Sequence, residues 1–132
     1  FVGFENITLE AILGVLLSPA AWLLGVPWAE ASTVGSLIGQ KLILNEFVAY
    51  VAFSEVSDTL SPISQAIVIF ALCGFANLSS IAILLGGLGA IAPTRRDDIS
   101  RLGVRALIAA TLANLMSASL AGFFLSLPGA AG

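Results

Sequence analysis

Hydrogen-bonding side chains interrupt the most apolar part of the sequence at residues 74–80, Gly-Phe-Ala-Asn-Leu-Ser-Ser. The uncharged run between Asp58 and Arg95 is long enough to cross a bilayer, which takes about 20 apolar residues. Asn77 and Ser80 would then lie near the middle of the membrane. A glycine with polar neighbours at that depth is typical of a broken helix, whose freed backbone groups must be buried in protein or line a polar cavity. The pattern therefore predicts a transporter binding site near the bilayer midplane.

The residue types at this break could bind a ligand or could serve packing. Asn77 and Ser80 are three positions apart and would share one face if a helix resumes there. Phe75 could offer its ring to a planar ligand. However, amides and hydroxyls in membrane helices often only hydrogen-bond neighbouring helices, an interaction worth about 1 kcal/mol, and a phenylalanine is usually core. The residues alone leave both roles open.

A second candidate is Glu46, which lies between the apolar residues 42–44 and 47–48. An ionisable group with apolar neighbours on both sides is unfavourable in a membrane, and such a residue is functional by default. The alternative is a glutamate on the surface of a helix.

Composition assigns the chain to a membrane and excludes several other classes. Of its 132 residues, 58% are hydrophobic and 10% charged, against about 25% charged in soluble domains, and the mean hydropathy is +1.05. The net charge of −3 comes without a basic patch, so no nucleic-acid partner is expected. The lack of histidine and the single Cys73 exclude a Cys/His zinc site and an internal disulfide. With no nucleophile and base pair and no phosphate loop, neither an enzyme nor a cofactor is predicted. The sequence starts at Phe1 without a visible signal peptide, as expected for a piece of a longer protein.

The first half of the chain predicts two elements. Residues 4–27 contain a proline near their middle and a tryptophan towards their end, which favours a bent helix at the membrane interface. Residues 31–56 are hydrophobic but too polar for a simple span, because they include Gln40 and Lys41 as well as Glu46. Two short helices meeting at a polar turn over residues 44–46, a re-entrant hairpin, would accommodate this pattern.

The second half predicts a broken transmembrane helix over residues 62–92, a loop over 93–105 and a final transmembrane helix over 102–127. The loop holds four of the five basic residues, which places it in the cytoplasm by the positive-inside rule. In the final helix, Asn114 is the expected donor of a hydrogen bond to another helix. The predicted fold class is an all-α membrane protein with a re-entrant hairpin, a discontinuous transmembrane helix and a final span.

Three stretches resemble one known family. They are Gly-Gln-Lys-Leu-Ile-Leu-Asn-Glu-Phe-Val-Ala-Tyr at residues 39–50, Ala-Leu-Cys-Gly-Phe-Ala-Asn-Leu-Ser-Ser-Ile-Ala-Ile at 71–83, and Ala-Pro-Thr-Arg-Arg-Asp-Asp at 92–98. The chain is similar, over about residues 3–127, to the C-terminal region of the bacterial concentrative nucleoside transporters. The resemblance implies one half of an inverted-repeat fold, assembled as a homotrimer in the bacterial inner membrane.

The resemblance also implies what each candidate residue does. Glu46, Asn77 and Ser80 are expected to hydrogen-bond the ribose of a uridine-like nucleoside, with Phe75 beside it. The first hairpin and first broken helix, which in the family read the nucleobase and hold the coupling sodium, are missing from these 132 residues. Base preference and the choice between sodium and proton coupling therefore stay open.

The implied function is secondary active transport of nucleosides by an elevator-type movement, with the bilayer and the substrate as partners. The alternative is a non-transporting membrane assembly or receptor module with the same fold.

Overall fold

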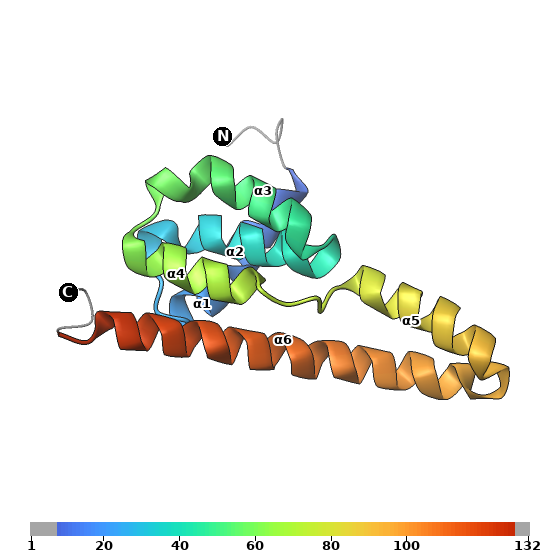
Figure 1. The fold of residues 1–132 in the computed structure, drawn as a ribbon. Coiled ribbons are helices and arrows are strands. Elements are labelled where there is room, and N and C mark those ends of the chain that lie inside the picture. Colours follow the sequence, from blue (N-terminus) through green and yellow to red (C-terminus); the bar gives the residue numbers. More distant parts are fainter. Residues whose placement is uncertain (1–7, 129–132) are drawn as a thin grey trace.

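The computed structural model describes residues 8–128, which are helical throughout and contain no strand within that range (Figure 1). Four helices gather at one end of the molecule, while α5 extends away from them and α6 runs back along the whole length. The elements are α1 (Leu9–Leu23), α2 (Trp28–Ile43), α3 (Glu46–Val56), the short 3-10 segment η2 (Ser57–Thr59), α4 (Pro62–Leu72), α5 (Leu78–Ile91), the short 3-10 segment η3 (Pro93–Arg95) and α6 (Arg96–Ser126).

The first two helices form a sharply bent pair that packs at very close range. Their axes differ by 115°, and Gly25 in the turn adopts φ 102°, a left-handed conformation that favours glycine. A Cβ atom at Gly35 of α2 would lie 2.8 Å from the carbonyl oxygen of Gly14 on α1, so these backbones touch. Of the element predicted at 4–27, residues 4–7 lie outside the described part, and its place at the membrane interface stays a prediction.

The chain reverses between α2 and α3, at the turn predicted for residues 44–46. Asn45 caps α3 by accepting a hydrogen bond from the Val48 amide at 2.9 Å. The first helix of this hairpin begins at Trp28, three residues before the predicted start. The hairpin packs on α4 through a buried apolar core to which α2 contributes Val34, Leu37 and Ile38 and α4 contributes Ile67, Val68, Ala71 and Leu72.

The helix predicted at 62–92 is broken where its glycine and polar residues are found. Ser61 caps α4, Pro62 follows at the first helical position, and the helix stops at Leu72. Helical structure resumes at Leu78, with Asn77 as the cap of α5. The described helices therefore agree with an all-α fold containing a discontinuous helix.

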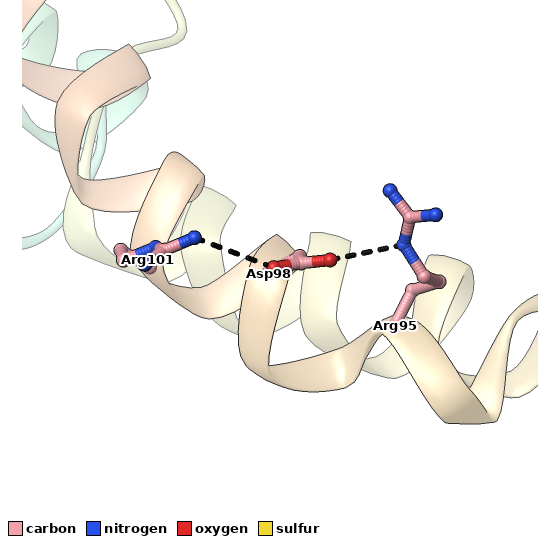
Figure 2. A network of polar contacts seen from close by, with 3 residues as sticks. All are labelled: Arg95, Asp98 and Arg101. Carbon is pink, nitrogen blue, oxygen red and sulfur yellow. Dashed lines mark hydrogen bonds and ion pairs between the residues drawn. The ribbon is translucent and has the colours of Figure 1, made fainter.

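The prediction of a loop over residues 93–105 was wrong for most of that range, because α6 begins at Arg96 and not at residue 102. Asp97 and Asp98 lie in the first turn of α6, where carboxylates interact favourably with the helix dipole. Figure 2 shows Asp98 between Arg95, at 3.0 Å, and Arg101, at 3.4 Å. These pairs are exposed, so each contributes little by itself, but their three-residue spacing is compatible with the helix that the structure has here.

One helical stretch of the described residues, Pro93–Ser126, is by itself long and apolar enough to cross a membrane. The bent pair of α1 and α2 meets the same criteria when its two helices are taken together, while α4 and α5 are shorter apolar helices. Most large apolar side chains of α6 are exposed in this chain, among them Ile108, Leu112, Met116 and Phe123.

Candidate functional site

The tip of the hairpin and the helix break meet through the predicted site residues. Glu46 is the first residue of α3 and Asn77 is the last residue before α5. The Asn77 side-chain amide donates a hydrogen bond to Glu46 Oε2 at 3.4 Å. Asn77 is buried, at 4% exposure, whereas Glu46 is half-buried. A carboxylate and a carboxamide that are 31 residues apart in the sequence therefore form one polar cluster.

Ser80 completes this cluster from the first turn of α5. Its backbone amide donates to Asn77 Oδ1 at 2.8 Å, which is the capping bond of the helix. Its hydroxyl lies 2.6 Å from the Phe75 carbonyl oxygen and 3.0 Å from Asn77 Oδ1. Because a hydroxyl carries one proton, Ser80 donates to one of these acceptors at a time and keeps lone pairs for a ligand.

The condition under which Asn77 and Ser80 would share one face of a helix is not met, because the helix resumes at Leu78 and not at Asn77. The backbone of Asn77 is extended, with φ −147° and ψ 169°, and it precedes the helix. The sequence contained the signal, since asparagine directly before an apolar helical run is a preferred cap. Asn77 thus has a structural task in addition to its contact with Glu46.

Three of the four predicted residues line one cavity of about 300 Å³ between the helix break, α5 and α6. Phe75, Asn77 and Ser80 contribute to it, and Phe75 is 81% exposed. The remaining walls are hydrocarbon, from Ile81, Leu84, Leu107 and small residues including Gly103 and Ala106. Glu46 does not line this cavity, but it accepts a hydrogen bond from Asn77, which does. The arrangement combines an apolar wall with a polar edge, which suits a ligand that has an aromatic part and hydroxyl groups.

Two carbonyl groups in the last turn of α4, before the break, accept hydrogen bonds from side chains of other elements. Asn114 of α6 donates its side-chain amide to the Ala71 carbonyl oxygen at 2.5 Å, which confirms the predicted interhelical hydrogen bond. The Tyr50 hydroxyl donates to the Ile69 carbonyl at 2.8 Å. Gly74 leaves room for the Asn114 amide, because a Cβ atom there would lie 2.9 Å from Asn114 Oδ1. These two carbonyl groups are therefore paired within protein, as non-helical backbone at membrane depth requires.

Sequence reasoning missed a second link between the hairpin and the broken helix, at the opposite end of α2. Glu30 Oε2 accepts hydrogen bonds from the Ser61 amide at 3.2 Å and from the Ser61 hydroxyl at 3.0 Å. Ser61 also caps α4, so a carboxylate lies at the positive end of that helix. Glu30 and Ser61 are 31 residues apart, and no local pattern relates them.

Within residues 8–128, no group of three or more histidine, cysteine, aspartate or glutamate side chains is placed to hold a metal ion.

Comparison with known proteins identifies the family. The sequence model described as "Na+ dependent nucleoside transporter C-terminus" matches residues 1–122. The chain is 58% identical over 123 residues to the uncharacterized transporter YutK of Bacillus subtilis (strain 168), with 93% of this chain and 30% of that protein covered. It is 56% identical over 128 residues to the putative nucleoside permease NupX of Escherichia coli (strain K12), with 95% and 31% covered.

A solved structure agrees with these relatives. CNTnw in an inward-facing substrate-bound state matches with a TM-score of 0.87 and 56% identity, over 93% of this chain and 31% of that one. The chain thus spans less than a third of the length of the relatives it matches. By the family match over nearly its whole length, the chain belongs to the Na+-dependent nucleoside transporter family, as part of its C-terminal region.

Proposed function

We propose that the protein containing this chain is a secondary active transporter that couples inward sodium flow to nucleoside uptake, and that this chain supplies the ribose-binding half of its site. The observation that carries the proposal is the contact between Asn77 and Glu46, which brings a carboxylate and an amide together beside the apolar cavity. The family and the relatives, which are named as transporters rather than enzymes, support the nucleoside and sodium parts.

Ribose suits these groups chemically. Its neighbouring hydroxyls can donate hydrogen bonds to the Glu46 carboxylate and to the Ser80 hydroxyl oxygen. The two amide hydrogens of Asn77 are donated to Glu46 Oε2 and to the Phe75 carbonyl oxygen, so Asn77 would exchange one of these bonds to donate to the ribose. In residues 8–128, the only hydrogen bond to the Glu46 carboxylate comes from Asn77 and reaches Oε2, so Oε1 is available to a ligand. A sugar without those hydroxyls would leave buried polar groups unpaired, which lowers its affinity.

The assembly and the movement are parts of the same proposal. We place the protein in the bacterial inner membrane as a multi-pass homotrimer, in which the hairpin and the broken helix move together as an elevator against a scaffold. The two links between them, Glu30 with Ser61 and Glu46 with Asn77, support their movement as one unit.

The test is uptake of radiolabelled uridine by the purified full-length protein in liposomes, under a sodium gradient and separately under a proton gradient. Uptake should require sodium. Glu46→Gln should reduce it by about tenfold or more, since hydrogen bonds to charged groups are worth about 1.5–3 kcal/mol. Glu55→Gln is the matched control, because Glu55 is an exposed glutamate of the same helix α3. Uptake driven by protons alone would contradict the coupling ion. Normal uptake by Glu46→Gln would remove Glu46 from the site. No uptake under either gradient from folded protein would favour the non-transporting alternative.

A further inference from the structure

Lys41 is a buried cation in the middle of the predicted membrane region. It is the only lysine of the chain and its residue exposure is 1%. It lies in the last turn of α2, three residues before the turn of the hairpin begins. No carboxylate of residues 8–128 forms an ion pair with it within 4 Å. A lysine is almost never fully buried without a compensating partner.

One acidic side chain lies near Lys41, although no group neutralises it directly. Lys41 is in the last turn of α2 and Glu46 is the first residue of α3, so the two lie on either side of the hairpin turn, where the carboxylate attracts the ammonium group. The Cys73 thiol and the Tyr50 phenol also belong to this neighbourhood. Two helices also end here, α2 at Ile43 and α4 at Leu72, directly before Cys73. Helix C-termini carry partial negative charge, which favours a cation in the last turn.

We propose that Lys41 is a positioning residue for Glu46. Its positive charge compensates the negative charge of Glu46 at the hairpin tip and the partial negative charge of the helix ends near the break. This inference rests on the proposed function, since its purpose is to hold Glu46 ready for the ligand. A direct ion pair would occupy the carboxylate oxygens. At a separation beyond 4 Å the ammonium group still stabilises the carboxylate, because burial of Lys41 reduces the screening of this attraction by water, and it leaves Oε1 free.

The competing explanation is that the long side chain of Lys41 only fills space between α2 and α4. Methionine and arginine at this position separate the two explanations. Methionine keeps most of the apolar stem and removes the charge, while arginine keeps the charge and changes the shape.

The experiment measures uridine KM and Vmax for the full-length protein in liposomes with Lys41→Met, Lys41→Arg and the neighbouring control Gln40→Met. Lys41→Met should raise the uridine KM by about tenfold or more, as expected for losing an interaction with a charged group. Lys41→Arg should restore most of the affinity, and Gln40→Met should behave as the unmodified protein. An unchanged KM in Lys41→Met, or a loss in Lys41→Arg equal to that in Lys41→Met, would overturn the proposal.

A second measurement does not depend on transport. Thermal unfolding in detergent is compared for Lys41→Met, Glu46→Gln and the double variant. Glu46→Gln leaves the buried Lys41 and Lys41→Met leaves the half-buried Glu46 without its counterpart. Each should therefore lower the melting temperature, and the double variant should lose clearly less than the sum. Additive losses would contradict the electrostatic link. If the unmodified protein failed to carry nucleosides but this coupling was present, the proposed function would fall and the placement of Lys41 would stand.

Discussion

Asn114→Ala and Gly74→Ala should each destabilise the helix break, and combining them should cost little more than Asn114→Ala alone. The first change removes the hydrogen bond from the Asn114 amide to the Ala71 carbonyl. The second places a Cβ atom 2.9 Å from Asn114 Oδ1 and 3.0 Å from its Cγ, closer than real Cβ contacts. The amide must then move away, and it loses the same hydrogen bond.

The magnitudes follow from these contacts. Loss of the interhelical hydrogen bond should reduce the free energy of unfolding by about 1–2 kcal/mol. Gly74→Ala should lose the same amount and a further 1–3 kcal/mol, approximately, for the forced displacement. In the double variant the clash is absent because Asn114 has been shortened, so the loss should return to about 1–2 kcal/mol. Backbone strain adds nothing, since Gly25 is the glycine with positive φ among the described residues.

The assay is thermal unfolding of the purified full-length protein in detergent, with uridine uptake measured in parallel. Gly86→Ala is the control, because a Cβ atom there meets nothing within 4 Å and alanine favours the helix. Uptake should fall together with stability in both single variants, because the hydrogen bond from Asn114 to Ala71 positions the segment that carries Phe75 and Asn77. Strictly additive losses in the double variant would refute the reasoning, as would a Gly74→Ala protein as stable as Gly86→Ala.

Two further predictions concern the site and its orientation. Alanine at Asn77 or Ser80 should weaken the binding of ribonucleosides more than that of deoxyribonucleosides, measured by competition with labelled uridine. Asn77→Ser keeps a helix-capping side chain and removes the amide, so it separates the two roles of Asn77. Equally weakened binding of both sugar classes would indicate a structural role only. Thr94→Cys in a Cys73→Ala background should resist an impermeant thiol reagent applied outside intact cells, because the exposed Thr94 lies in η3, beside arginines that the positive-inside rule predicts to be cytoplasmic. Rapid labelling would contradict this orientation.

The helix break, the hairpin turn and the hydrogen bond from Asn114 could be predicted from sequence because each has a local signal. The apolar helix α4 ends at Leu72, two residues before the glycine that has polar neighbours, and a polar turn divides the hairpin. An amide in an otherwise apolar helix must find a partner, and Asn114 does so at Ala71.

Other features depend on contacts that sequence alone does not reveal. Arginine density suggested a loop at residues 93–105, but α6 begins at Arg96 with Asp97 and Asp98 in its first turn, where carboxylates favour a helix. The partner of Glu30 lies 31 residues away, and the burial of Lys41 depends on how α2 packs against α4. Such pairings are decided by tertiary structure.

The two links between the hairpin and the broken helix lie at opposite ends of α2, so a small rotation of α2 about one end displaces the other. This helix has 16 residues and is therefore about 24 Å long, with the doubly bonded Glu30 at its base and the long Asn77 to Glu46 contact beyond its tip. A rotation of only about 2–3° around the base would displace the tip by about 1 Å over that length, enough to break a hydrogen bond that is already 3.4 Å long. The base contacts would hardly change, so of the two links the tip contact is the more sensitive to small rotations of α2, and movement as one unit depends mainly on the link at the base.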